Sequence, residues 1–304
     1  MQHSLMNRFR GLFLGVAVLE AYLGNSSLRG FDGISIQGRK HCLQSPPKGL
    51  GWTDAMIASA QTLVMTQAPS QRTALQNEDY ALAHHIARML PVALFWHENP
   101  LTLEQLICEQ YLQESDLELQ AGFVGMGIAI ALICQEQANP QNLIPQLLTH
   151  QCLTGTLIHT QLSQIQALLT THASLMTVCN QVSQSSPPQR LAASIAIAFY
   201  CWLSTADSFP LTLSRLLTLP QPSIVAVLIG SVLSGVTNGI SGIPLSWQTP
   251  LFVSSAADAR QRILMSADQL LVAWSGYYSQ EMMPTPLPLE QIAISAPGVL
   301  RPRK

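Results

Sequence analysis

Apolar residues recur at helical spacing along almost the whole chain. No region alternates apolar and polar residues with a period of two between hairpin turns, which is the pattern of a half-buried strand. The pattern therefore predicts an all-α protein. We expect helices at residues 5–23, 53–66, 77–92, 102–112, 116–135, 141–151, 156–172, 189–204, 210–218, 223–238 and 257–278.

Clusters of Ser, Pro, Gly and Asn separate these helices, as in "QSPPKGLG", "ANPQN" and "SQSSPP". No repeat with a period of 20 to 50 residues is present, so a helical solenoid is not supported. We expect residues 1–282 to form one compact multi-helix domain. Residues 283–304 are rich in proline and predict an extended tail lying over the body.

Two of the expected helices carry stripes of small residues. In the helix at 223–238, small and apolar residues with i, i+4 spacing lie on one side; they are Ala226, Gly230 and Ser234, and Val227, Ser231 and Gly235. The first helix has a similar small face at Gly11, Gly15 and Ala17. Small residues let backbones approach closely, so we expect these two helices to pack together at the centre of a bundle.

The composition indicates a globular protein with a weakly charged surface. Hydrophobic residues make up 48% of the 304 residues, and charged residues only 11%, compared with about 25% in an average domain. Gln, Ser and Thr supply much of the surface polarity. The net charge of -2 and the absence of a basic run longer than the terminal "RPRK" argue against nucleic acid as a partner.

The six cysteines are scattered singly, mostly in apolar runs such as "IALIC", and no Cys-x-x-Cys pair occurs. This pattern favours reduced, buried thiols and therefore a cytoplasmic protein.

We expect no membrane-spanning segment. Arg8 and Arg10 precede an apolar run that imitates a signal peptide, but Glu20 follows without a small-x-small cleavage site. The apolar runs at 121–134, 191–203 and 224–236 are shorter than the about 18 to 20 residues that cross a bilayer.

Four segments in order resemble the ADP-ribosylglycohydrolase family. They are "RFRGLFLGVAVLEAYLG", "GWTDAMIASAQTL", "AGFVGMGIAIALICQEQANPQNLIPQLL" and "LAASIAIAFYCWLSTADSFPLTLSRLLTLPQPSIVAVLIGSVLSGVTNGISGIPLSW". The most specific part is the last, where the small residues, the "GIP" turn and Trp247 align without a gap. The resemblance implies an all-helical single domain that removes ADP-ribose from proteins with the help of two magnesium ions.

The resemblance also implies where the metal-binding acids would lie. In the first block, Leu19 and Glu20 stand at the family's Gly-Asp, so one acid remains. Ser26 or Ser27 stands where the family has a glutamate that serves catalysis and metal binding.

The second block aligns with the family's Thr-Asp-Asp-Thr loop. The four positions then fall on Leu50, Gly51, Trp52 and Thr53, which contain no carboxylate. Sliding the alignment by one residue places Thr53 and Asp54 on Thr-Asp but leaves Ala55 at the second aspartate.

The third block normally carries Asp-x-Asp-Thr at the start of the central helix. Here these positions hold Gln221, Pro222, Ser223 and Ile224. Ser is a favoured N-cap and Pro fits the first turn, so the helix start is kept while the carboxylates are gone.

The "GFVGMG" segment overlies a part of the family that lies near its ligand. Met126 matches the family, but Gly127 replaces an arginine, which weakens nucleotide binding. With Ser27, these positions form a vestigial ligand cleft. Trp52 either fills the vacated metal cleft or stacks on an adenine-like ring, and filling is favoured.

Several histidines are poor candidates for a site. His84 and His85 are adjacent and face different directions on a helix, so we interpret them as a surface or interface pair rather than metal ligands. His97 and Glu98 in "FWHENP" are interpreted as a helix exit and turn.

The preferred hypothesis is a pseudoenzyme without catalytic residues or bound magnesium, because magnesium requires oxygen ligands and few remain. It would act through protein contacts, with a protein partner or as a homo-oligomer. Two alternatives stay open. One is a residual hydrolase of N-glycosyl bonds that uses Glu20 and Asp54. The other is a module that binds ADP-ribose or another nucleotide without cleaving it.

Overall fold

The computed structural model describes residues 3–24, 51–66, 78–111, 117–139, 141–182, 187–248, 251 and 257–276. Over these residues the chain forms thirteen α-helices and no strand, which confirms the predicted all-α class. The α-helices are α1 (Leu5–Gly24), α2 (Trp52–Thr66), α3 (Glu78–Phe95), α4 (Pro100–Leu106), α5 (Leu117–Cys134), α6 (Leu143–Leu148), α7 (Leu157–Thr170), α8 (Leu175–Gln181), α9 (Pro187–Leu203), α10 (Phe209–Leu217), α11 (Ile224–Asn238), α12 (Leu245–Gln248) and α13 (Ala257–Trp274). Three short turns of other pitch are the π-helix η1 (Ile107–Tyr111) and the 3-10 helices η2 (Gln151–Leu153) and η3 (Ile240–Gly242).

Every helix expected from the sequence is present, with two changes. The helix expected at 102–112 becomes the π-helix η1 after Leu106, and the one at 141–151 divides into α6 and η2. The short helices α8 and α12 were not expected. In α8 only Val178 is buried, so no apolar period marks this helix in the sequence. The expected tail at 283–304 and the domain boundary before it lie outside the described residues.

The helices α1 and α11 pack with their backbones almost in contact, as their small faces predict. A Cβ atom on Gly235 would lie 2.6 Å from the carbonyl oxygen of Gly11. The Ser231 hydroxyl donates a hydrogen bond of 2.8 Å to the carbonyl oxygen of Gly15. The two helices run antiparallel, because positions that increase along α1 meet positions that decrease along α11.

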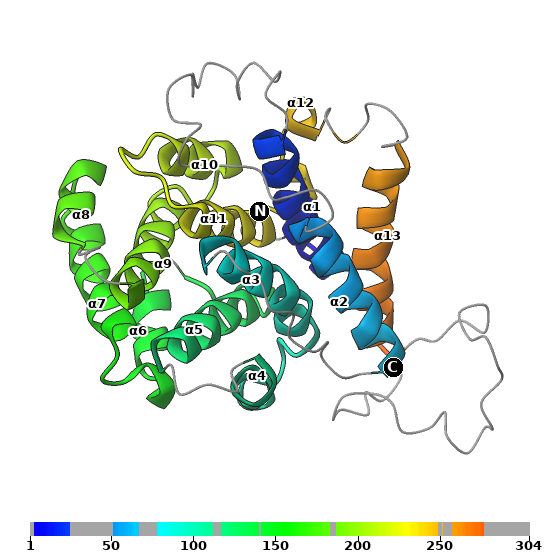
Figure 1. Cartoon of the computed structure of the whole chain (residues 1–304), viewed down its shortest axis with the longest axis horizontal. Helices are drawn as coiled ribbons and strands as arrows, with labels where there is room; N and C mark the ends of the chain where they lie inside the picture. Colours follow the sequence, from blue (N-terminus) through cyan, green and yellow to red (C-terminus); the bar gives the residue numbers. More distant parts are fainter. Residues whose placement is uncertain are drawn as a thin grey trace.

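The second small stripe of α11 packs against α10. Leu216 occupies the space where a Cβ atom on Gly230 would lie, and the Ser234 hydroxyl donates to the Thr212 hydroxyl at 3.3 Å. Both stripes are therefore in use, and α11 lies among other helices in the middle of the bundle (Figure 1).

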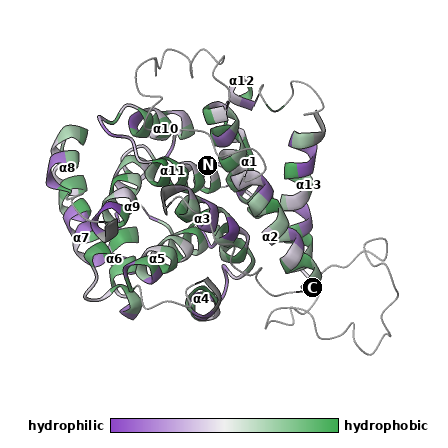
Figure 2. Ribbon diagram, in the orientation of Figure 1, coloured by the Kyte–Doolittle hydropathy of each residue, from purple (hydrophilic) through white to green (hydrophobic). Residues whose placement is uncertain are grey.

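The helix α5 forms another central part of the core. It begins at Leu117, earlier than the apolar run in the sequence, and is the one described helix that is long and apolar enough to cross a bilayer. The rest of the protein buries 72% of its residues, as in the core helix of a globular protein. Figure 2 shows α5 and α11 mainly in the hydrophobic colour, while the peripheral α7, α8 and α13 also carry the hydrophilic colour.

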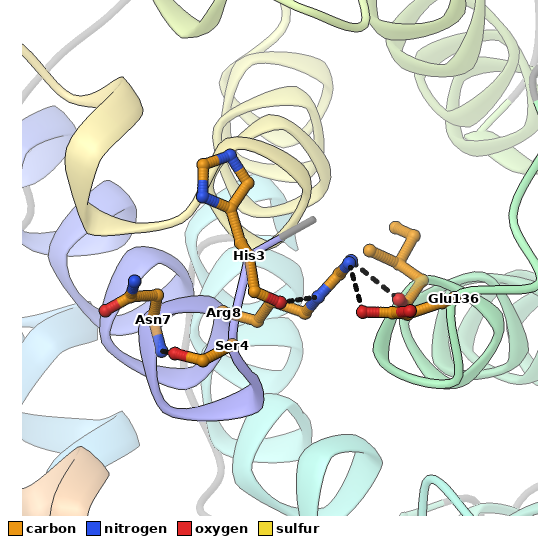
Figure 3. Close-up of polar contacts among 6 residues, drawn as sticks. His3, Ser4, Asn7, Arg8 and Glu136 are labelled. Atoms are coloured by element: carbon orange, nitrogen blue, oxygen red, sulfur yellow. Dashed lines mark hydrogen bonds and ion pairs between the residues drawn. The ribbon is translucent and has the colours of Figure 1, made fainter. Parts of the chain in front are cut away.

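Two arginines fix α1 relative to other helices. Arg8 is 7% exposed, and its guanidinium donates to the carbonyl oxygen of Ile133 at 2.7 Å and to the Glu136 carboxylate at 3.4 Å (Figure 3). It thereby satisfies a backbone group at the C-terminus of α5, where the helix dipole favours a cation. Arg10 makes a bidentate contact with Asp268 of α13, with both distances 2.7 Å.

The contact between α1 and α11 predicts a large cost for one added methyl group. Because a Cβ atom on Gly235 would meet the backbone of α1, Gly235→Ala should lower the free energy of unfolding by at least about 2 kcal/mol. Chemical denaturation followed by circular dichroism measures this change.

Gly125→Ala in α5 is the matched control. There the atom nearest to a new Cβ would be Cδ2 of Leu153 at 3.5 Å, which is an ordinary van der Waals contact. Replacing a helical glycine should then raise stability by about 0.5 to 1 kcal/mol. Equal effects of the two substitutions would contradict the close approach of α1 and α11.

Candidate functional site

Contacts through α1 connect the three segments on which the resemblance places the metal positions. Gly11 lies against Gly235 and Gly15 against Ser231, so the C-terminal end of α1 points toward the start of α11. The backbone N–H of Thr53 donates to the Glu20 carboxylate at 2.8 Å, which joins the start of α2 to the same end of α1. We call this meeting of α1, α2 and α11 the three-helix junction.

Glu20 serves as a cap for α2 within the junction. Its carboxylate accepts a hydrogen bond from a backbone group at the N-terminus of α2, which would otherwise lack a partner. Burial raises the pKa of the Glu20 carboxyl; the hydrogen bonds from Thr53 work in the opposite direction, and the charge of Asp54 adds to the rise. Keeping this carboxylate ionised therefore lowers the stability of the folded protein.

Asp54 lies beside Glu20 but faces solvent. Its carboxylate pairs with Arg262 of α13 at 3.3 Å, and the two side chains are 69% and 60% exposed. A Cβ atom on Gly51 would lie 2.5 Å from one oxygen of Glu20 and 3.5 Å from one oxygen of Asp54. Both carboxylates thus approach the Gly51 backbone closely, and no larger residue fits between them without displacing Glu20.

Trp52 is fully buried at the start of α2. Its ring stacks on Tyr80 of α3, with the ring centroids 6.4 Å apart and the planes inclined by 27°. Its indole N–H has no hydrogen-bond partner among the residues that the structure describes. At a position where one of the two alignments expects a carboxylate, this chain therefore places a bulky apolar ring inside the fold.

The start of α11 uses a hydroxyl instead of carboxylates. The Ser223 hydroxyl accepts a hydrogen bond from the Ala226 N–H at 3.4 Å, as the predicted N-cap requires, and a second one from Ser194 at 2.9 Å. Gln221 is exposed, and the side chain of Ile224 is buried. Ser223 thus caps the helix, Ile224 contributes to the core, and Gln221 faces solvent.

The described residues of the junction do not fit a pair of magnesium ions. Magnesium is held mainly by carboxylate and phosphate oxygens in near-octahedral geometry. No group of three or more His, Cys, Asp or Glu side chains suited to a metal ion occurs in the described parts of the chain. Of the described residues, only Glu20 and Asp54 bring carboxylates to the junction, and both have other partners.

The two described residues of the expected ligand cleft point into different surroundings. Met126 lines a small apolar pocket together with Leu82, Phe123 and Ile229. Gly127 faces α4 and η1 instead, where a Cβ atom would lie 3.0 Å from Ile107. An arginine at position 127 would have no room, and the third residue, Ser27, lies outside the described residues.

The histidines of α3 differ in part from the expectation. His84 and His85 are each 8% exposed, so the prediction of a surface pair is wrong. Burial, and then the charge of Arg88, lower the pKa of His84. His97 lies in the turn after α3, as expected, with its Nδ1 atom 2.6 Å from the carbonyl oxygen of Leu94.

Two partners of the junction residues had no signal in the sequence. Arg262 lies 208 positions from Asp54, and Tyr80 belongs to a different helix from Trp52. No local motif connects either pair, so only the folded chain reveals them.

A family model described as ADP-ribosylglycohydrolase matches residues 18–279. This range covers most of the chain and includes the end of α1 from residue 18 onward together with all of α2 and α11. None of the curated proteins compared with the chain matches it.

The half-buried carboxyl of Glu20 predicts a dependence of stability on pH. Folding raises the pKa of this carboxyl above its value in the unfolded chain, which is about 4.3. The free energy of unfolding therefore falls as the pH rises from the unfolded pKa through the raised pKa. Glu20→Gln removes this loss and keeps a hydrogen-bond acceptor. The variant should therefore melt at a higher temperature than the wild type at pH 7, and the difference should shrink near pH 4.

Asp54→Asn is the control, because its exposed ion pair should contribute little at either pH. A Glu20→Gln variant that is less stable than the wild type at pH 7 would show that the ionised carboxylate stabilises the fold.

The buried ring of Trp52 predicts a second difference between variants. Trp52→Ala should lower the free energy of unfolding by about 3 to 5 kcal/mol, because it leaves a cavity beside Tyr80. Trp52→Phe should cost much less, since it keeps an aromatic ring and removes an N–H without a partner. Similar, small losses for both variants in chemical denaturation would contradict the filling role of Trp52.

Proposed function

The chain belongs to the ADP-ribosylglycohydrolase family, and we propose that it is a pseudoenzyme that keeps the family fold and acts through contacts with other proteins. The observation that carries this proposal is the use made of the remaining acids. Glu20 caps α2, and Asp54 pairs with Arg262. Carboxylates with these structural partners are poorly placed to bind two metal ions.

The charge at the junction supports the same proposal. Binding of divalent cations weakens as the number of charged ligands falls. At the start of α11 the acid positions hold Gln221 and Ser223, and at the start of α2 they hold Gly51 and Trp52. Without the ions, several kcal/mol of transition-state stabilisation would be missing.

The filling of the junction by Trp52 supports a role without nucleotide. A ring that is fully buried and already stacked on Tyr80 offers no free face to an adenine. This geometry favours the pseudoenzyme over a nucleotide-binding module.

The cysteines support our proposal that the protein works in the cytoplasm. The five cysteines in the described parts of the chain are all free thiols. Burial raises the pKa of Cys134 and Cys201 to about 12, so these two thiols are unreactive.

A residual hydrolase is the second candidate. One observation favours it: the carboxylates of Glu20 and Asp54 lie on the same Gly51 backbone, and the Glu20 pKa is raised. A carboxyl with a raised pKa is typical of a general acid, although structural groups show the same shift.

Magnesium titration tests the proposal. Calorimetry with MgCl₂ should show no saturable binding to the wild type, and an ADP-ribosylated protein should release no ADP-ribose in its presence. Gln221→Asp with Ser223→Asp restores two carboxylates at the start of α11, and Asp is a favoured N-cap. This double variant should bind magnesium more tightly than the wild type.

The matched control is Gln221→Asn with Ser223→Asn, which keeps the capping ability and adds no charge. Tight magnesium binding by the wild type, or release of ADP-ribose that Glu20→Gln abolishes, would overturn the proposal and establish the residual hydrolase.

A further inference from the structure

One long part of the chain contains no charged residue. Residues 137–189 include no Asp, Glu, Lys or Arg, whereas the chain's own charged fraction of 11% would place about six there. This stretch supplies α6, η2, α7 and α8. Its polar residues are Gln, Asn, Thr, Ser and three histidines.

These elements lie along one edge of the molecule (Figure 1). The helix α7 packs between α6 and α9 and buries residues such as Ile158, Leu162 and Ile165. Its opposite side exposes Thr160 and Gln164, one turn apart. We call the exposed surface of α6, η2, α7 and α8 the neutral face.

Two of the charges that border the neutral face are engaged by backbone groups or by a cation, while Glu104 of α4 lies beside Cys152 of η2 and Arg190 is exposed at the start of α9. The Glu118 carboxylate accepts hydrogen bonds from the N–H groups of Leu157 and Ile158, at 2.7 and 3.3 Å. Glu136 pairs with Arg8. The face itself therefore presents neutral groups to its surroundings.

A surface of this kind is suited to an interface. Charged residues keep protein surfaces soluble and apart, and they are depleted in the cores of protein interfaces. Neutral amides and hydroxyls also lose less hydration free energy than charges when they are covered. Met176, which is 54% exposed, and the exposed Ala167 add apolar area to the face.

We infer that the neutral face binds a second copy of this chain in a two-fold symmetric contact. Near a two-fold axis a residue meets its own copy, so each charge there would face a like charge. A face without charges avoids this repulsion, and the net charge of -2 adds little repulsion at longer range. This dimer rests on the proposed function, because it identifies the partner and the surface of the protein contacts proposed there.

Added charge on the neutral face tests the inference. Thr160→Glu with Gln164→Glu places two carboxylates on the outer side of α7, where each would face a like charge across the contact. Sedimentation velocity over a dilution series should give twice the mass of one chain for the wild type. In the double variant the dimer should dissociate at least about a hundredfold more readily, because like charges in an interface cost several kcal/mol.

The matched control is Gln105→Glu with Gln261→Glu, which adds the same charge at exposed positions of α4 and α13. It should remain a dimer, and both double variants should keep the melting temperature of the wild type. A wild type with the mass of one chain at every concentration would overturn the inference. So would a dimer that survives in the Thr160→Glu, Gln164→Glu variant.

The failure of this inference is distinct from the failure of the proposed function. Magnesium binding measured on the same wild-type sample tests the junction, while the sedimentation mass tests the neutral face. A monomer that binds no magnesium would overturn the second copy as partner and leave the pseudoenzyme standing.

Discussion

The close contact between α1 and α11 sets the position of almost everything else in the structure. Gly11 and Gly235 let two backbones meet where side chains would normally separate them, and the bond from Ser231 to Gly15 fixes the register. The register brings the end of α1 to the start of α11, and Glu20 then holds the start of α2 at the same place. The junction is thus a consequence of backbone packing and of the hydrogen bond that the Glu20 carboxylate accepts.

The residues at the junction meet local needs of the fold. Ser223 supplies the cap at the start of α11, and Trp52 fills space with an aromatic ring that packs on Tyr80. Glu20 and Asp54 take up contacts with Thr53 and Arg262. Each of these contacts satisfies a local demand of packing or hydrogen bonding, so residues that bring little charge maintain the architecture.

Local patterns in the sequence predicted much of this structure, and contacts between distant residues were beyond them. The helical periods, the two small faces and the cap at Ser223 depend on neighbours within a few positions. The ion pair of Asp54 with Arg262 joins residues 208 positions apart. The burial of His84 and His85 was missed for a related reason: polar residues suggest a surface, but α3 is buried on all sides from residue 83 to residue 95.

The pairing of the first helix with the eleventh also has a consequence for synthesis on the ribosome. The hydroxyl that binds Gly15 belongs to a residue 216 positions later, so α1 leaves the ribosome long before its partner exists. Until then the apolar face of α1 stays without its native cover, and contacts of such high sequence separation form slowly. The native cover of α1 is therefore complete only after both α11 and α13, whose Asp268 pairs with Arg10, have left the ribosome.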